Sequence, residues 1–402
     1  MKANNMQPDD LYYDPYDYAI DADPHPVWRR MRDEAPLYYN REYDFYALSR
    51  YRDVYDASLD HQTFSSAHGT VLELMSRKHD FSTMMIWLDP PDHTQLRKLV
   101  GRTLTVRRVA ELEPRIRSLC AEYLDPFVGS AGFDYVEEFA ARLPVMVIGS
   151  LLGVPVEDQD TVRGWTDQSL HVEPGETQSN RGAVEAWGHL REYFQEQIDQ
   201  RRRAPSDDLM SDLVASEIEL EDGSTRRLSD DEVHGFVNLL SSAGNETVAR
   251  LLGWTALLLS EHPEQREQLA ADASLIPGAV EELLRYEAPS PIQARYVTRD
   301  VELHGQIVPE GSKIALLNGS AGRDEREFTD ADRFDITRPI DSHVSFGYGL
   351  HFCIGASLAR MEARVAIEET LARFPRWEAS REKIEMVHTS TVRGPSSVHI
   401  SL

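Results

Sequence analysis

The stretch FGYGLHFCIG, from Phe346 to Gly355, contains one of only two cysteines in a chain of 402 residues. Glycines stand on both sides of Cys353, and glycine lets a backbone turn tightly and approach a flat ligand closely. The residues that follow, from about Ala356 to Phe374, have the apolar spacing of a helix. The N-terminus of such a helix would present free amides and a positive dipole end to the sulfur, which favours a thiolate.

Three interpretations of Cys353 are open at this point. An inert cysteine that packs as a small hydrophobic residue is the usual case for an isolated cysteine. A zinc site needs three or four protein ligands, which a lone thiolate without a nearby cysteine or histidine pair does not supply. A thiolate can, however, be the single protein ligand of a haem iron. The other cysteine, Cys120, lies in the helical pattern RSLCAEYL and is expected to be an ordinary core residue.

The composition limits the classes of protein to which the chain can belong. Lys and Arg total 42 against 68 Asp and Glu, a net charge of −26, which disfavours binding to nucleic acid or to anionic membranes. Two cysteines cannot form a secreted disulfide framework, so a reducing compartment is expected. The polar, acidic N-terminus lacks the apolar run of a signal peptide, and no stretch approaches 18 consecutive apolar residues. We therefore expect a cytoplasmic protein.

Helical periodicity dominates the chain, and strand-like patterns are short. We expect a mainly helical body with small β-sheets, in a single domain that spans residues 1–402. Helices are predicted at Pro26–Asp33, Tyr51–Ser58, 92–125 and 181–203, and strands at Tyr43–Ser49, within Ala294–Asn318 and in the C-terminal SSVHISL. The polar segment between Arg203 and Asp230 is predicted to be a flexible excursion.

One predicted helix has clear start signals and a weak middle. Ser229 and Glu232 fit a capping box, and the pattern runs to about Ser260, which gives a rod of roughly 45 Å at about 1.5 Å per residue. The middle of this helix is Ala243–Thr247, AGNET. A glycine in a helix interior lowers helix stability by about 1 kcal/mol relative to alanine. A weakened polar turn in a long, buried helix calls for a functional explanation.

The segment Phe346–Gly355 resembles the haem-binding signature of the cytochrome P450 family, Phe-Gly-x-Gly-x-His-x-Cys-x-Gly. The resemblance extends from DPHPVWRRMRDEAP at Asp23–Pro36 to the last strand-like segment, in the manner of a soluble bacterial member. It implies the cytochrome P450 fold, with haem b between the long central helix and the helix after the cysteine, and Cys353 as the metal ligand. Other cofactor-binding positions that it implies are Phe346, Gly347, Gly355, Ala243, His93, Arg97, Arg295 and His351.

The AGNET turn resembles the oxygen-activation motif of the same family. The resemblance implies that Gly244 leaves room for dioxygen and that Glu246 and Thr247 deliver protons. A kink without chemistry is the alternative. Val248 follows the threonine where many relatives have another hydroxyl, which leaves details of the proton path open.

A Glu-x-x-Arg pair, Glu282 and Arg285, lies on one face of a predicted helix. Taken alone, such a pair is most often a surface ion pair of little worth. The resemblance implies a buried structural triad instead, completed by Arg333, with Arg338 as the second choice. Its implied role is folding and haem retention.

Two further sets of residues have an ordinary alternative. His93 and Arg97 share one helix face and could form a solvated surface, but the resemblance places them, with Arg295 and His351, at the haem propionates. The substrate pocket is expected to include the apolar residues Met84, Met85, Ile86, Leu239, Leu240 and Ile292, each of which could equally be ordinary core.

The implied activity is that of a haem-thiolate monooxygenase. It would insert one oxygen atom from O2 into a hydrophobic or aromatic small molecule by hydroxylation, epoxidation or O/N-dealkylation. Electrons would come from NAD(P)H through a ferredoxin and its reductase, and a monomer is expected. A basic set comprising Arg97, Lys98, Arg102, Arg107, Arg108, Arg360 and Arg364 could dock an acidic ferredoxin or simply be solvated. A peroxide-driven peroxygenase and a non-catalytic haem or ligand-binding module remain alternatives.

Overall fold

The protein is described by a computed structural model over residues 8, 10–75, 84–103, 105–170, 181–219, 223–387, 389 and 391–402. Helices make up most of it, as the sequence predicts. The α-helices are α1 Tyr18–Ala22, α2 His25–Glu34, α3 Tyr51–Leu59, α4 Asp92–Thr103, α5 Val106–Glu111, α6 Glu113–Leu124, α7 Arg142–Leu152, α8 Val156–Leu170, α9 Arg181–Arg203, α10 Leu209–Ala215, α11 Asp230–Glu261, α12 Pro263–Ala271, α13 Ile276–Tyr286, α14 Asn318–Ala321 and α15 Ala356–Arg373.

The strands are short. They are β1 Leu37–Asn40, β2 Phe45–Leu48, β3 Phe64–Ser65, β4 Gly132–Asp134, β5 Glu217–Glu219, β6 Thr225–Arg227, β7 Gln293–Val297, β8 Val301–Leu303, β9 Gln306–Val308, β10 Lys313–Leu316, β11 Glu385–Met386, β12 Pro395–Ser397 and β13 His399–Ser401. Five of them form the largest sheet, in the order β1-β2-β10-β7-β3, and the others form two-stranded ribbons.

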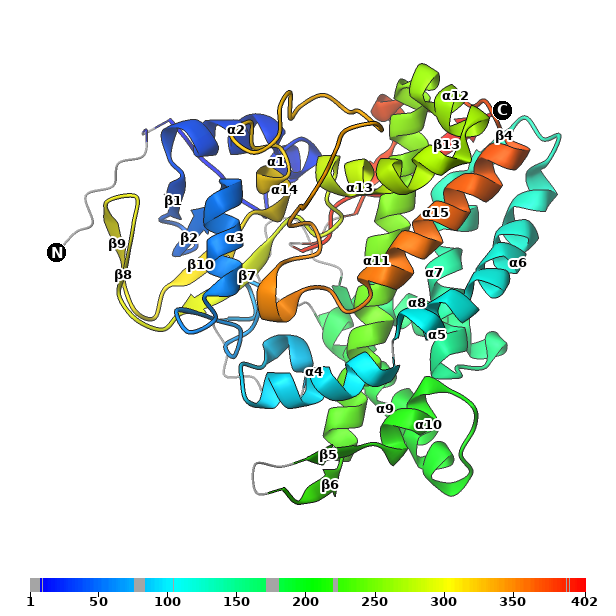
Figure 1. Ribbon diagram of the computed structural model, residues 1–402, viewed down its shortest axis with the longest axis horizontal. Helices are drawn as coiled ribbons and strands as arrows, with labels where there is room; N and C mark the ends of the chain where they lie inside the picture. Colours follow the sequence, from blue (N-terminus) through cyan, green and yellow to red (C-terminus); the bar gives the residue numbers. More distant parts are fainter. Residues whose placement is uncertain are drawn as a thin grey trace.

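The long helix α11 runs through the molecule, between the sheet on one side and helices α6 to α9 on the other (Figure 1). Helix α15 and the loop before it lie beside α11 (Figure 1). The largest apolar core joins residues of α6, α7, α9, α11, α13 and α15, so α11 is covered by protein along most of its length. This arrangement brings the AGNET turn and the cysteine loop to the same region of the interior.

The predicted capping box of α11 is confirmed. The Ser229 hydroxyl accepts from the Glu232 amide at 3.2 Å, and the Glu232 carboxylate accepts from the Ser229 amide at 2.8 Å. The helix then continues without a break through Gly244 to Glu261. Core packing along the helix therefore outweighs the low helix propensity of its middle turn.

Two predictions of elements need correction. The pattern over 92–125 is three helices, because Thr105 caps α5 by accepting from the Arg108 amide and Pro114 stands in the first turn of α6. The described residues of segment 203–230 are folded, whereas the sequence predicts a flexible segment. It contains α10 and the hairpin of β5 and β6, and the apolar residues Leu213 and Ile218 bury themselves against the core.

The sheet positions one strand at the site. Strand β10 pairs parallel with β2 and antiparallel with β7, so Arg295 of β7 lies opposite Ile314 of β10. Side chains alternate between the two faces of a strand, which sends Gln293 and Arg295 to one face of β7 and Ala294 to the other.

Within the described segments, no single helix is long and apolar enough to cross a membrane. The stretches Val136–Leu152 and Val156–Thr166 meet that criterion only when taken together, and they are bent by 117°.

Candidate active site

The cysteine loop is held in a fixed shape by its own backbone. Gly347 and Gly349 have φ angles of +67° and +68°, in the left-handed region that favours glycine. A side chain on Gly349 would also meet the Ser58 carbonyl oxygen, 2.7 Å from the ideal Cβ position. The Cys353 amide donates to the Phe346 carbonyl at 2.9 Å, which closes the loop just before α15.

The surroundings of Cys353 do not ionise it by themselves. Burial raises the pKa of the thiol, and the Gly355 amide and the cations Arg97 and Arg360 oppose this shift without reversing it. The amide at the start of α15 therefore favours the thiolate, as expected, but burial outweighs it, so the pKa of the thiol is raised overall. A positive metal centre at the sulfur is what such a site needs to deprotonate it.

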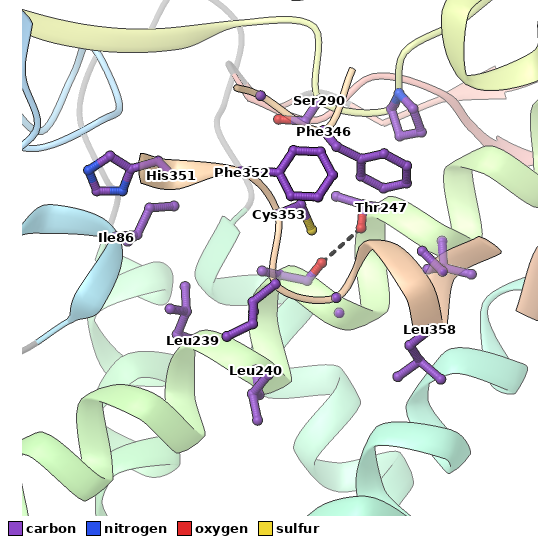
Figure 2. Close-up of a pocket in the computed structure, with 18 of the residues that line it drawn as sticks. Ile86, Leu239, Leu240, Thr247, Ser290, Phe346, His351, Phe352, Cys353 and Leu358 are labelled. Carbon is purple, nitrogen blue, oxygen red and sulfur yellow. Dashed lines mark hydrogen bonds between the residues drawn. The ribbon is translucent and has the colours of Figure 1, made fainter. Parts of the chain in front are cut away.

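Most of the predicted site residues line one cavity (Figure 2). It contains Cys353 and, from the predicted cofactor and catalytic sets, His93, Arg97, Ala243, Gly244, Thr247, Arg295, Phe346, Gly347, His351 and Gly355. These residues come from α4, α11, β7 and the cysteine loop. Elements far apart in the sequence thus converge on one site.

One end of the cavity carries polar groups without partners. Within the described part of the chain, both ring nitrogens of His93 and Nε2 of His351 have no hydrogen-bond partner, and the two ring centroids are 4.3 Å apart. Arg295 is buried and donates to the Ala294 carbonyl at 2.7 Å, while Arg97 donates to the Phe352 carbonyl. Burial of unsatisfied donors is costly, so this end of the cavity fits an acceptor-rich, anionic group.

The pKa values of these groups agree with that conclusion. Burial, and then Arg97, lower the pKa of His93 to about 4. Burial, and then Arg295, lower the pKa of His351 to about 2. Burial also lowers the pKa of Arg295 to about 10. All three shifts show that burial disfavours the positively charged form of these side chains. An anion placed among the three side chains would favour the charged form instead.

Thr247 and Glu246 face different surroundings. The Thr247 hydroxyl lines the cavity and donates to the Ala243 carbonyl one turn earlier at 2.8 Å (Figure 2). The Glu246 carboxylate is buried outside the cavity lining, where it pairs with Arg250 at 3.2 Å. Arg250 in turn donates to the Pro395 carbonyl. The predicted proton-delivery pair is therefore adjacent in sequence, but only its threonine contacts the cavity.

The structure gives Gly244 a packing role that the sequence did not predict. A Cβ at this position would lie 2.9 Å from Cδ1 and 3.0 Å from Cγ1 of Ile148, on the neighbouring helix α7. The missing side chain thus allows α7 to approach α11. Gly244 also lines the cavity that contains Cys353.

The third member of the Glu-x-x-Arg triad is Arg338, and the first choice, Arg333, is wrong. Glu282 and Arg285 are fully buried and joined by hydrogen bonds of 2.6 and 2.8 Å. Arg338 donates from Nε to both Glu282 oxygens at 3.2 and 3.3 Å. The Arg333 side chain is 70% exposed, because the turn through Asp330–Arg333 directs its carbonyl inward and its side chain outward.

Four of the six predicted pocket residues line the cavity: Met85, Ile86, Leu239 and Leu240. Ile292 does not, because it lies on the opposite side of the backbone from Gln293 and packs with Ala294 in the core beneath the sheet. Met84 does not either, since it precedes the turn Met85–Trp87 in extended backbone and is buried elsewhere.

Comparison with known proteins decides the family. A family model described as cytochrome P450 matches residues 169–401. A protein named as cytochrome P450 123 in Mycobacterium tuberculosis is 43% identical over 396 residues, covering 98% of this chain and 97% of that protein. The chain belongs to the cytochrome P450 family. This cytochrome P450 is also 38% identical over 388 residues to the vitamin D(3) 25-hydroxylase of Pseudonocardia autotrophica, with 94% of each chain covered.

The structure agrees with that assignment. The cytochrome P450 CYP109E1 from Bacillus megaterium, solved in complex with testosterone, superposes with a TM-score of 0.86 at 32% identity, over 95% of this chain and 98% of that one. As a cytochrome P450, the protein is a monooxygenase that uses haem b, O2 and electrons supplied from outside. The cavity fits this cofactor, since it contains a lone thiol, the unpartnered ring nitrogens of His93 and His351, and the cations Arg97 and Arg295, from which two carboxylates could accept hydrogen bonds.

Several lining residues were missed by the sequence analysis. Among them are the polar residues Ser290, Gln293, Asn318 and Glu362. Gln293 could have been found, because it lies two residues before Arg295 on the same strand face. The others lie at turns or on a helix whose inward face was assigned to apolar core, so no local pattern marks them.

Proposed function

We propose that this cytochrome P450 inserts one oxygen atom into a hydrophobic small molecule held above Cys353, and that the Cys353 thiolate is the iron ligand. The observation that carries the proposal is the shared cavity of Cys353, Thr247 and the unpartnered His93 and His351. The haem, when bound, supplies the reduction and activation of dioxygen. His93, Arg97, Arg295 and His351 would hold its carboxylates, and Glu282, Arg285 and Arg338 would keep the loop region folded.

Thr247 is proposed to hand protons into the cavity. Its hydroxyl can leave the Ala243 carbonyl and donate into the cavity by rotation about one side-chain bond. Glu246 is the adjacent acid, but it must first leave Arg250, to which it is paired at 3.2 Å. Proton supply through this acid therefore requires that ion pair to open.

The proposed substrate is apolar or aromatic and lacks a carboxylate. Met85, Ile86, Leu239 and Leu240 give the lining its apolar and adaptable character. The charged residues at the cavity, Arg97 and Arg295, lie at the end assigned to the cofactor. Two relatives, by their names, act on vitamin D(3) or bind testosterone, which are bulky apolar molecules. Hydroxylation of such a molecule is the reaction that we propose first.

A reduced carbon-monoxide difference spectrum tests the ligand. We expect a thiolate-type Soret band for the purified holoprotein and for Cys120→Ala, whose cysteine is buried in the core and does not line the cavity. Cys353→Ala should lose that band. A thiolate band retained in Cys353→Ala would refute the assignment. Substrates would then be sought by Soret shifts across apolar compounds, and turnover compared with NADH plus ferredoxin and reductase, with peroxide alone, and with neither.

A ferredoxin is the proposed electron donor, but its docking surface differs from the predicted basic set. Arg107, Arg108, Arg360 and Arg364 are each paired with a carboxylate, namely Glu111, Asp212, Glu281 and Glu113 respectively. The side chain of Arg102 lies outside the described residues. Lys98 is exposed on α4, next in sequence to the cavity residue Arg97. We propose that Lys98, with the exposed Phe352, contributes to docking of an acidic ferredoxin.

Charge reversal tests this surface. Lys98→Glu should raise the ferredoxin concentration needed for half-maximal reduction and weaken its salt dependence, whereas Lys383→Glu, an exposed control near the C-terminus, should do neither. Equal effects of the two variants would refute the surface. We also propose that the protein acts as a monomer in the cytoplasm, where a reducing environment keeps both cysteines out of disulfide bonds.

A further inference from the structure

A carboxyl group that has no role in the proposal above lies at the cavity. Glu362, on α15, lines the same cavity as Cys353 and Thr247 and is 0% exposed. Within the described part of the chain, neither of its carboxyl oxygens has a hydrogen-bond partner. A buried carboxylate without a partner is strongly unfavourable, so this side chain carries a proton under most conditions.

The position of Glu362 follows from the helix. It lies one turn after Leu358, which faces the cavity from α15 (Figure 2). Residues four apart lie on the same face of a helix, so Leu358 and Glu362 both lie on the face of α15 that is turned toward the cavity. This placement contrasts with that of Glu246, whose carboxylate lies outside the cavity lining and is paired with Arg250.

Glu362 forms no hydrogen bond with the described groups packed around it, although the cations Arg97 and Arg295 line the same cavity. The titratable group that faces it from α6 is Cys120, a thiol whose pKa is raised to about 12 by burial and by Glu369 and Glu362 itself. Charged residues on each helix packed on α15 have other partners. The ion pairs are Glu113–Arg364 and Arg117–Glu368 from α6, Arg107–Glu111 in α5, Glu246–Arg250 in α11, and Glu281–Arg360 and Glu282–Arg285 from α13. Arg266 of α12 donates to the Leu259 and Trp377 carbonyls.

Charge added to this cavity acts on Glu362 as well as on His93, Arg97, Arg295 and His351, which line the same cavity. Burial raises the pKa of Glu362 to about 8, which places its ionisation within reach of solution experiments. An added negative charge in the same low-dielectric space opposes ionisation further.

We propose that Glu362 exchanges a proton with solvent in step with the oxidation state of the haem. The inference rests on the proposed ligation of haem by Cys353. In the step, an external reductant gives one electron to the haem iron, and the Glu362 carboxylate binds one proton from water, so that the charge of the cavity is unchanged. The step takes place at pH values at which Glu362 is ionised when the haem is oxidised and protonated when the haem is reduced.

The test is the midpoint potential of the substrate-free holoprotein as a function of pH. In the native protein we expect the potential to fall as the pH rises above about 8, approaching a tenfold change in the reduction equilibrium per pH unit, which is about 59 mV for one electron. Glu362→Gln should lose this slope. Glu368→Gln is the matched control, a glutamate of the same helix that is already paired with Arg117 and Arg364, and should retain it. The same slope in Glu362→Gln as in the native protein would overturn the proposal.

A second measurement covers the case in which Glu362→Gln does not fold. Redox-induced infrared difference spectra of the native holoprotein above pH 8 should show a carboxylic-acid carbonyl band appearing on reduction, and Glu362→Asp should shift its frequency. A spectrum without such a band would also overturn the proposal. The carbon-monoxide spectrum separates the two hypotheses: thiolate ligation with a slope unaffected by Glu362→Gln refutes only the proton coupling, whereas absence of thiolate ligation refutes the proposed function.

Discussion

Arg338 donates from Nε to both carboxylate oxygens of Glu282, at 3.2 and 3.3 Å, although 56 residues separate them in the chain. Glu282 is fully buried, and Arg285 is its other cationic partner. Arg338 also donates to the carbonyls of Thr329, Asp330 and Arg333, and so ties the segment ahead of the cysteine loop to α13. The Arg338 guanidinium thus both pairs with the buried Glu282 carboxylate and holds the irregular backbone between Thr329 and Arg333 in place.

Loss of Arg338 is the first prediction. Arg338→Ala should lower the free energy of unfolding by about 3–5 kcal/mol, because it removes a partner from a buried carboxylate. Arg333→Ala, whose side chain is 70% exposed, should change it by no more than about 0.5 kcal/mol. Urea denaturation and haem content would measure both variants. Similar losses in the two would show that Arg333 completes the triad after all.

The second prediction concerns Thr247. Thr247→Ala should lower the product formed per electron supplied several-fold and raise the yield of peroxide, while Thr247→Ser should retain most of the native coupling. Thr255→Ala is the matched control, since Thr255 makes the same 2.8 Å hydroxyl-to-carbonyl bond on α11 but lies outside the cavity lining. NADH consumption, peroxide and product would be measured together. Well-coupled turnover by Thr247→Ala would rule out the proton-delivery role.

The third prediction uses the contact between Gly244 and Ile148. Replacement of a helix-interior glycine by alanine is worth up to about 1 kcal/mol of stability when the site has room. Gly188→Ala on α9, with nothing within 4 Å of its Cβ position, should show that gain. Gly244→Ala should lower stability, because the Cβ would lie 2.9 Å from Ile148 Cδ1.

A double-mutant cycle isolates that contact. In the Ile148→Ala background, Gly244→Ala should become neutral or stabilising, with a coupling energy of at least about 0.5 kcal/mol. The measurement is denaturant unfolding of the four proteins. Additive losses would mean that Gly244 is needed for something other than the approach of α7.

The fourth prediction concerns acid stability. Burial alone would raise the pKa of Glu281, but hydrogen bonds from Arg360 and His343 outweigh it and lower the pKa to about 2. A carboxyl whose folded pKa lies below its ordinary value of 4.5 stabilises the fold above pH 4.5 and loses that contribution as the pH falls toward 2. The stability difference between the native protein and Glu281→Gln should therefore be constant above pH 4.5 and shrink below it.

The measurement is the free energy of unfolding as a function of pH between 2 and 7. Glu385→Gln, at an exposed position in β11, is the control and should parallel the native protein throughout. A stability difference for Glu281→Gln that stays constant down to pH 2 would contradict the prediction.

Periodicity and spacing predicted the parts of the fold whose interactions are local. The limits of α9, the capping box at Ser229 and the pairing of Glu282 with Arg285 all depend on neighbours within four residues, and the structure has each of them. The glycine spacing around Cys353 likewise reports a loop geometry that is fixed within ten residues.

The errors share a different cause. The choice between Arg333 and Arg338 depends on which side chain an irregular turn directs inward, and nothing in the local pattern encodes that direction. The role of Gly244 depends on Ile148 of another helix. The chemistry of Glu362 depends on the lack of a partner, which no sequence pattern reveals. Tertiary contacts decide all three.

The strand order β1-β2-β10-β7-β3 has a consequence for synthesis of the protein. The N-terminal hairpin Leu37–Leu48 leaves the ribosome long before its partner strand Lys313–Leu316 exists. At about 5–20 residues per second, the nascent chain carries an unpaired strand edge for many seconds. The loop bearing Cys353 is translated later still, so the thiolate can bind the cofactor only after residue 353 has been added to the chain.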